Sequence, residues 1–434
     1  MKIKQLDLEN FRGFAGKHLV KFHAEKPTVI IGVNGSGKTS VLDAVGILLG
    51  IEFEFNGLLG DKQIISLQKS DISKSGDNVN LKIYYQNENN IIETQSLTEV
   101  DFSFFKGVIN TKFSDDLGSK LSKIIFLNEN KSLPVILYQR TNRSISGQII
   151  KSYSVDITIN KKERLKAYKN IFKEGIELAE IIGWYIQQIN IQNALKIEKK
   201  DMDYEISSLK NLTEGVNKFL NILNSNKLSS FGIQRSTYEK GQVLTIQKND
   251  KYLEFNQLSA GERMLIGLAL DIGYRMTVAN PHSDNALLSP GIVLIDELEL
   301  HLHPKWQSTV LNALHKTFPN IQFIVTTHSP LVINHVHSDQ LVLISDDKIV
   351  QGEAVQEVYG KDANSIIENI MGAPKRPKDV EAMIEEIWTY LKDDNLQLDK
   401  AKEKLSQLQA KIGRNDSEVL ELDTMILLEE DETY

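Results

Sequence analysis

Hydrophobic and polar positions follow two different patterns in the amino-terminal part of the chain. Residues 2–9 alternate between the two kinds, as in a strand with one buried face, whereas residues 28–33 (TVIIGV) are almost entirely apolar, as in a strand buried on both faces. A helix is expected over about 38–49, and alternation returns within 79–97. We therefore expect residues 1–160 to form a lobe with a mixed or antiparallel sheet.

Residues 161–230 change to a helical pattern. The second of two expected helices carries an apolar face made of Leu209, Leu212, Val216, Leu220 and Leu223. This pattern predicts a short helical-hairpin insertion of coiled-coil type. Past it, residues 244–258 alternate again, with a turn expected at Asn249-Asp250.

Helix and strand alternate within residues 231–373. One helix is expected from about Gly261 and another near Pro304, a residue suited to the first turn of a helix. The accompanying strands are expected at residues 291–297, 321–328 and 340–345. Apolar strands that alternate with helices indicate a parallel sheet covered on both faces, so the predicted fold class is α/β.

Residues 374–434 are expected to form an acidic helical extension. Pro374 and Pro377 mark a linker, residues 378–412 a helical pair, and residues 417–434 a tail or docking segment with seven acidic residues and no basic one. The extension holds nine Lys and Arg against sixteen Asp and Glu, a net charge of −7, which leaves −1 of the total −8 for the rest of the chain. Bulk charge therefore does not indicate a broad nucleic-acid footprint.

Composition excludes several classes of protein. The chain has no Cys, so it has neither disulfides nor a cysteine zinc site. No apolar run approaches the roughly 18–20 residues of a membrane span, and we expect a cytoplasmic protein without membrane contact. A local nucleic-acid contact stays open, because the lysine-rich segment 151–173 fits either a phosphate-backbone footprint or a solvated helix face.

A glycine-rich loop lies between the apolar strand and the first expected helix. Residues 32–39 (GVNGSGKT) fit the pattern G-x-x-x-x-G-K-[ST]. Glycines let backbone N–H groups face phosphates, Lys38 would bind the β- and γ-phosphates, and Thr39 would ligate Mg²⁺. The predicted nucleotide contacts are Asn34, Gly35, Ser36, Gly37, Lys38, Thr39 and Ser40.

Two later strands end in residues suited to phosphate chemistry. Asp296 and Glu297 close the strand GIVLIDE, and His328 closes IQFIVTTH. At one edge of a parallel sheet, Asp296 can hold Mg²⁺ through water, Glu297 can polarise the attacking water, and His328 can hydrogen-bond the γ-phosphate. We predict Glu297, His328 and Lys38 as the catalytic residues.

Other polar pairs carry weaker interpretations. His301 and His303 form an H-x-H pair without a third ligand at suitable spacing, so a strand-to-helix junction is favoured over a metal site. Asp346-Asp347 is interpreted as a turn. Arg140 and Arg143, which follow Tyr138 and an apolar strand, are possible phosphate contacts.

The motifs GVNGSGKT, LSAGER, IVLIDE and TTHSP occur in the order seen in ATP-binding-cassette (ABC) ATPases, and the chain resembles that family, within it the RecF/SMC/OLD group. The resemblance implies a P-loop ABC-ATPase head that uses ATP and Mg²⁺. The opening LENFRGF is similar to the group's first strand, which makes Arg12 a candidate phosphate or adenine contact. The group also places a Mg²⁺-reaching glutamine near Gln68, with Gln63 as the competitor.

In that family LSAGER is the signature motif, which closes over the nucleotide of a second subunit. The implied trans residues are Ser259, Ala260, Gly261 and Glu262, and the implied assembly is a homodimer of heads or a higher oligomer. Taken alone, Ser259 followed by Glu262 is also a helix capping box, and both roles can hold together.

The distances between motifs exclude a long SMC-type arm, and we expect no TOPRIM nuclease domain after His328, because only 106 residues follow it here. What remains resembles PtuA-type ATPases of Septu and some retron antiphage systems. That resemblance implies a separate HNH nuclease, possibly docked by the extension. The alternatives are a RecF-like repair ATPase that loads other factors onto DNA, and a scaffold held together by nucleotide with little turnover.

Overall fold

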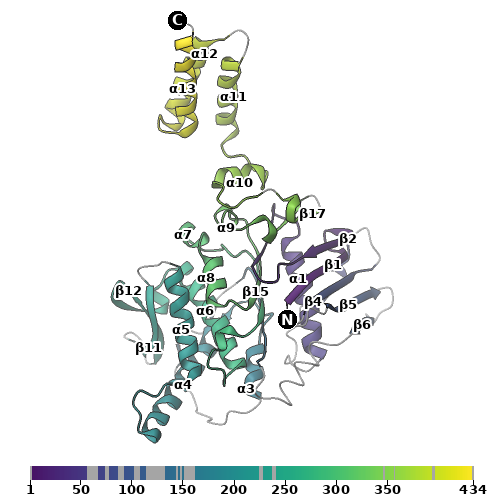
Figure 1. Cartoon of the computed structure of the whole chain (residues 1–434), viewed down its shortest axis with the longest axis vertical. Helices are drawn as coiled ribbons and strands as arrows, with labels where there is room; N and C mark the ends of the chain where they lie inside the picture. Colours follow the sequence, from purple (N-terminus) through teal and green to yellow (C-terminus); the bar gives the residue numbers. More distant parts are fainter. Residues whose placement is uncertain are drawn as a thin grey trace. The chain divides into compact units, whose positions relative to one another are not determined.

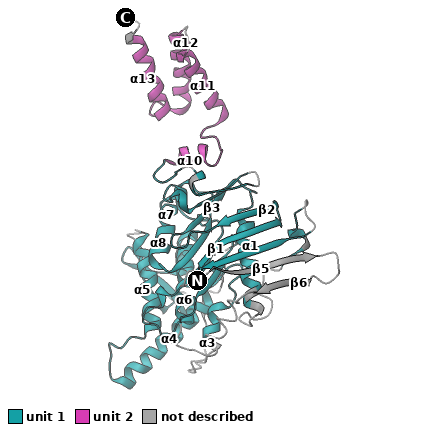
Figure 2. Ribbon diagram, turned by 45° about the vertical axis from the view of Figure 1, so that its right-hand side comes forward, with its two compact units in different colours: residues 1–361 teal, residues 362–434 magenta. Residues whose placement is uncertain are grey.

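The computed structural model describes most of the chain, as two compact units, residues 1–361 and 362–434 (Figure 2). The described residues are 2–55, 67–73, 78–86, 92–101, 108–113, 132–142, 145–146, 149–150, 162–223, 228–236, 241–345, 348–355, 357–392 and 396–432. The predicted α/β class is confirmed, with parallel and antiparallel sheets in the first unit (Figure 1).

A six-stranded sheet forms the centre of the first unit, in the order β17-β16-β3-β15-β14-β7. Its strands are β3 (Thr28–Gly32), β7 (Val135–Gln139), β14 (Gly291–Ile295), β15 (Ile321–Thr326), β16 (Leu341–Ser345) and β17 (Lys348–Gln351). All pairs are parallel except β16 with β17. Every residue of β3, β7, β14 and β15 is buried, as the apolar runs predict for strands covered on both faces.

A second, antiparallel sheet has the order β2-β1-β4-β5-β6. Its strands are β1 (Lys2–Phe11), β2 (Phe14–Lys21), β4 (Asn80–Gln86), β5 (Ile92–Asp101) and β6 (Val108–Phe113). Gln322 of β15 joins the two sheets, because its side chain accepts from the backbone N–H of Ile3 at 2.7 Å and donates to the Ile3 carbonyl at 2.8 Å. The predicted amino-terminal sheet is confirmed over these strands.

Smaller strands form two further sheets. In one, β8 (Ile145–Ser146) pairs in parallel with β10 (Ile176–Glu177). The other is antiparallel and contains β9 (Ile149–Ile150), β11 (Leu228–Arg235), β12 (Gln242–Lys248) and β13 (Lys251–Glu254). The predicted turn at Asn249 and Asp250 joins β12 to β13, and both residues have positive φ, as a type I′ hairpin requires.

The helices of the first unit pack on the central sheet or on one another. They are α1 (Lys38–Phe55), α3 (Lys162–Leu165), α4 (Leu178–Lys199), α5 (Ser207–Ile222), α6 (Ala260–Ala279), α7 (Pro304–Gln307), α8 (Val310–Thr317) and α9 (Pro330–Ile333). Short 3-10 turns lie at Lys69–Asp71, Lys166–Tyr168, Phe255–Gln257, Ala286–Leu288, Ser338–Gln340 and Gly352–Ala354. Helix α6 is buried along almost its whole length, so its sequence is apolar on nearly every side.

The two helices expected in residues 161–230 are α4 and α5. The apolar face of α5, from Leu209 to Leu223, is buried, and α5 packs against α6 and α8. It is therefore an integral part of the head. Within residues 162–223, large apolar side chains are exposed at Ile197, near the end of α4, and at Met202, just after it.

The second unit contains α10 (Ala363–Asn369) and a bundle of α11 (Lys378–Lys392), α12 (Leu398–Ile412) and α13 (Ser417–Glu432). The predicted helical pair is confirmed, but the tail interpretation is wrong, since residues 417–432 form a third helix. Val419, Leu422 and Ile426 of α13 lie in the bundle core, which offsets the cost of ordering an acidic segment. Within the part of the chain that the structure describes, no helix is long and apolar enough to cross a membrane.

Candidate nucleotide site

The glycine-rich loop connects β3 to α1, and two of its residues have positive φ angles that favour glycine. Gly37 has φ +101°, and a Cβ placed there would lie 2.8 Å from the ring of Phe14. Gly35 also has positive φ, at +82°. Between them, the buried Oγ of Ser36 has no hydrogen-bond partner among the described residues. A compact loop with a partnerless hydroxyl and a following helix start fits a bound phosphate.

Lys38, the first residue of α1, points back into this loop. Its Nζ donates to the carbonyls of Gly32 and Val33, each at 3.0 Å. Burial lowers the pKa of Lys38, and the carboxylates of Asp296, Glu297 and Glu299 oppose that shift. The ammonium group therefore lies among the loop carbonyls, where it can meet phosphate oxygens.

Thr39 and Asp296 meet although 257 positions separate them. Thr39 Oγ1 donates to Asp296, with distances of 3.1 and 3.0 Å to the two carboxylate oxygens. Thr326 of β15 fixes the same carboxylate by donating to Oδ1 at 2.6 Å. A hydroxyl beside a carboxylate is the kind of oxygen donor set that Mg²⁺ prefers, so Thr39 and Asp296, two of the three predicted metal residues, fit the ion.

Glu297 lies at the turn that ends β14. Its φ is +48°, an uncommon conformation for a side chain of this size, and its N–H donates to Thr326 Oγ1 at 2.7 Å. The charges of Asp296 and Glu297 both act on Lys38 and on His328. The turn thus brings two adjacent acids to one site, as the motif predicts.

His328 reaches this site from the end of β15. Its backbone N–H donates to Oε1 of Glu299, whose Oε2 accepts from Thr327 Oγ1 at 2.7 Å. Burial lowers the pKa of His328, with Lys38 as the second cause, so the imidazole is neutral at neutral pH. Glu299 was not predicted as a site residue, and the only available signal was that it is the third acid of IDELEL.

Arg12 is held by carboxylates in this structure. It donates to Asp43 of α1 at 2.6 Å and to Asp71 at 2.8 Å. Arg140 also donates to Asp43, at 2.8 Å, and the hydroxyl of Tyr138 does so at 2.9 Å. Asp43 is buried and lies one helical turn after Thr39, so its carboxylate anchors both arginines close to the phosphate loop.

The remaining predicted positions are less closely tied to the site. The described hydrogen bonds of Gln68 run through its backbone to Asp71, the partner of Arg12, and its side chain is exposed. Its role in metal binding stays a prediction. The interpretations of Gln63, Arg143, Asp346-Asp347 and the lysine-rich segment up to residue 161 lie outside the described residues.

The predicted capping box at the start of α6 is confirmed. The N–H of Glu262 donates to Ser259 Oγ at 3.3 Å, and Glu262 Oε2 accepts from the N–H of Ser259 at 2.9 Å. Glu262 Oε1 pairs with Lys248 of β12 at 2.7 Å. Ser259 and Ala260 remain exposed, so this helix start faces outward from its own chain.

Gly261 brings the start of α6 against the segment that follows Glu297. A Cβ at Gly261 would lie 2.6 Å from the carbonyl oxygen of His301. His303 instead caps α7, its Nδ1 accepting from the N–H of Lys305 at 3.2 Å. The H-x-H pair is thus part of a junction between the acidic strand and the next helix.

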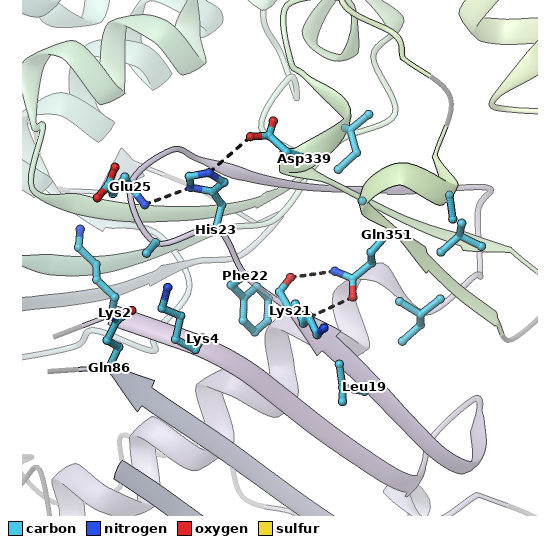
Figure 3. Close-up of a pocket in the computed structure, with 16 residues that line it drawn as sticks. Lys2, Lys4, Leu19, Lys21, Phe22, His23, Glu25, Gln86, Asp339 and Gln351 are labelled. Carbon is cyan, nitrogen blue, oxygen red and sulfur yellow. Dashed lines mark hydrogen bonds and ion pairs between the residues drawn. The ribbon is translucent and has the colours of Figure 1, made fainter. Parts of the chain in front are cut away.

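A groove of about 1130 Å³ lies elsewhere, where β1 and β2 meet β17 (Figure 3). Lys2, Lys4, Lys21 and His23 line it together with Asp339, whose Oδ2 lies 3.5 Å from Nε2 of His23. These positions precede β3 and β16, at the amino ends of the parallel strands. The phosphate loop follows the carboxyl end of β3, so the groove is separate from the nucleotide site.

The comparisons with known proteins agree with this geometry. Residues 28–334 match the family described as "AAA domain, putative AbiEii toxin, Type IV TA system". The chain belongs to this family. The match includes the phosphate loop, the signature helix start, the acid pair and His328.

Proteins similar to this chain include two retron proteins. The chain is 30% identical to "Retron Vc95 probable ATPase" of Vibrio cholerae serotype O1 biovar El Tor, over 80% of this chain and 74% of the relative. It is 27% identical to "Retron Ec83 probable ATPase" of Escherichia coli, over 87% and 77%. The Septu protein PtuA of Bacillus thuringiensis is 25% identical, over 88% of each chain. The expected resemblance to PtuA-type ATPases is therefore confirmed.

Solved structures that match the chain include SMC heads. The SMC head domain from Thermotoga maritima is 17% identical, with a TM-score of 0.42 over 81% of this chain and 100% of the other. An Smc head bound to the C-winged helix domain of ScpA is 17% identical, with a TM-score of 0.46 over 81% and 98%.

Proposed function

We propose that this protein binds ATP with Mg²⁺ and hydrolyses it to ADP and phosphate. The observation that carries the proposal is the hydrogen bond from the hydroxyl of Thr39 to the carboxylate of Asp296, directly beside Lys38. This bond joins the phosphate loop to the acidic strand end. Few functions other than phosphoryl transfer need a hydroxyl, a carboxylate and a lysine at one glycine-rich helix start.

The residues divide the work by their positions. Lys38 and the loop N–H groups hold the phosphates, and Thr39 with Asp296 would hold Mg²⁺, which offsets charge on the phosphate oxygens when bound. Glu297 takes a proton from the attacking water, and neutral His328 donates a hydrogen bond to the γ-phosphate. Glu299 fixes the backbone of His328 and thereby its direction.

We infer that two chains pair in the ATP-bound state, each with the start of α6 over the nucleotide of the other. Ser259 and Ala260 are exposed, and a helix start is a site for anions. Lys248 is paired to Glu262, and Arg263 of the same motif donates to the backbone carbonyl of Asn256 at 3.3 Å, so this surface has no counterpart of Lys38 set in a glycine-rich loop. It is suited to complete a site whose lysine lies elsewhere.

We further propose that the protein is the regulatory ATPase of an antiphage defence complex that controls a separate nuclease. The similarity to retron ATPases and Septu PtuA supports this role. The second unit offers a docking surface, because Leu420, Leu427 and Leu428 of α13 are 52%, 56% and 55% exposed. Seven acidic residues share that helix, so a basic partner fits best.

The decisive experiment measures phosphate release by the purified full chain with ATP and Mg²⁺. Asp296→Asn should lower the rate by about 10²-fold or more, because it weakens the metal site. Asp339→Asn, at the opposite edge of the sheet, is the matched control and should leave the rate unchanged. No Mg²⁺-dependent release by the unaltered chain, or equal rates for both variants, would contradict the proposal.

A further inference from the structure

A buried polar connection runs from the acidic strand to the signature helix. Gln139, the last residue of β7, accepts with its carbonyl from the N–H of Asp296 at 2.9 Å. Its side-chain Nε2 donates to Oδ2 of Asp271 on α6 at 2.7 Å. Gln139 and Asp271 are 2% and 3% exposed. One residue thus touches both the metal-binding acid and the helix that begins with LSAGER.

Asp271 is anchored firmly to α6. Arg275, one turn further, donates from Nε to Oδ1 of Asp271 at 2.8 Å. Its Nη1 donates to the carbonyls of Ala167 and Lys169, each at 2.8 Å. Burial raises the pKa of Asp271, and the charge of Arg275 opposes that shift. The carboxylate is therefore fixed on both of its oxygens.

The position of Asp271 along α6 determines what it can transmit. It lies eleven residues after Ala260, which corresponds to about 17 Å along a continuous helix. The helix is buried between these positions and contains no proline, so its start and Asp271 shift together.

Close packing of the core does not by itself require the hydrogen-bonded pair Gln139 and Asp271. Gln139 follows four apolar residues of β7, and its buried Oε1 has no hydrogen-bond partner within the described part of the chain. A buried acceptor without a partner is unfavourable, and an apolar side chain would avoid that cost. Retention of an amide here suits a role in aligning β7 with α6.

We propose that Gln139 and Asp271 are positioning residues that couple the two nucleotide sites of a pair of chains. Closure of α6 over the nucleotide of the partner subunit shifts Asp271, and Gln139 carries that shift to the backbone of Asp296 in the same chain. Occupancy of one site thereby sets the metal ligand of the other. This inference rests on the proposed ATP-dependent pairing.

The test compares two buried sets of hydrogen bonds between α6 and the β7 region. Gln139→Ala removes the hydrogen bond to Asp271, which belongs to the connection that leads to Asp296. Asn280→Ala removes the hydrogen bonds at the far end of α6. There, the side chain of Asn280 accepts from the N–H of Leu133 at 2.7 Å and donates to its carbonyl at 3.0 Å. The readouts are the rate of phosphate release against ATP concentration, the affinity for ATP, and the thermal midpoint.

Gln139→Ala should lower the Hill coefficient for ATP to about 1 and kcat by about ten- to hundred-fold, with ATP affinity unchanged within about two-fold. Asn280→Ala should lower the thermal midpoint but keep the cooperativity. Exchanging the groups, with Gln139→Glu and Asp271→Asn together, should restore part of the Hill coefficient, because one amide-to-carboxylate bond re-forms.

Three results separate the inference from the proposed function. Equal loss of cooperativity in Gln139→Ala and Asn280→Ala would overturn the inference, since any weakening of α6 would then suffice. Hydrolysis without cooperativity in the unaltered chain would also overturn it, while leaving the ATPase proposal intact. No hydrolysis by the unaltered chain would overturn the ATPase proposal itself.

Discussion

The starts of α1 and α6 are both glycine-bearing helix starts, yet the structure equips them differently. At α1, Lys38 and Thr39 are part of a dense set of contacts with Asp296, and the loop is shaped by positive φ angles. At α6, Ser259 is satisfied by Glu262 and the surface is exposed. The first start contains a lysine and metal ligands besides its backbone donors, whereas at the second start the charged Lys248 and Glu262 are paired with each other. This difference supports the proposal that a complete site combines the two starts from different chains.

The largest effect is expected from a substitution that stops hydrolysis at the α1 start but leaves the proposed contact between the α1 and α6 starts intact. Glu297→Gln removes the general base, so turnover should fall by about 10²- to 10⁴-fold. ATP binding should persist, and the paired state should accumulate because its nucleotide is not consumed. Size-exclusion chromatography with ATP and a phosphate-release assay check both effects. Unchanged turnover would refute Glu297 as the base.

The next prediction concerns a mixture of two variant chains, one altered at the α1 start and the other at the α6 start. Lys38→Ala and Ser259→Arg chains should each be inactive alone, the first for lack of phosphate binding and the second because Arg blocks closure. A mixture should partly recover activity, since a mixed pair retains one intact composite site. Differently tagged chains allow mixed assembly to be confirmed. If confirmed mixed pairs stay inactive, the α6 start does not act in trans.

A smaller effect is expected from the residue that positions His328. Glu299→Gln keeps one acceptor for Thr327 or His328 but loses the charge that holds both. The rate should fall by about ten-fold, within the range seen when a supporting residue is changed, with little effect on ATP affinity. Glu25→Gln, at the opposite edge of the sheet, is a surface control. An equal loss in both variants would exclude a specific role for Glu299.

The smallest effect concerns pH. Burial and Lys38 lower the pKa of His328 below the ordinary value near 6.5, so its neutral form persists to lower pH than in a free imidazole. The carboxylates of Glu299, Glu297 and Asp296 oppose this shift without reversing it. Turnover should therefore stay flat from pH 8 to about 6.5 and decline only below that value. His328→Gln should remove the decline from a reduced rate, and a decline that persists in this variant would assign it to another group.

Much of the α1 side could be predicted, because its motif residues have local spacing and the strand ends meet at one sheet edge. Thr39, Asp296, Glu297 and His328 meet as this topology predicts. The Gln139–Asp271 pair could not be predicted, because a single amide after an apolar run has no periodicity and its partner is 132 positions away.

The third helix of the second unit also could not be predicted from the sequence. Residues 417–432 carry apolar residues on two sides of one helix, so neither side stands out as a single amphipathic face. Their acidic charge favoured a solvated tail. In the folded bundle, Leu422 is buried while Leu427 is more than half exposed. Only the packing of α11 and α12 decides which face is the core.

The left-handed backbone of Glu297 has a consequence for the stability of the whole first unit. A non-glycine residue in this conformation costs on the order of 1–3 kcal/mol, and Thr326 and the end of β14 must hold it there. Glycine at this position would relieve that strain and should raise the thermal midpoint while ending turnover. The strain at this one residue thus lowers the free energy of unfolding of the first unit. Selection for heat resistance alone would tend to remove the carboxylate on which the proposed hydrolysis depends.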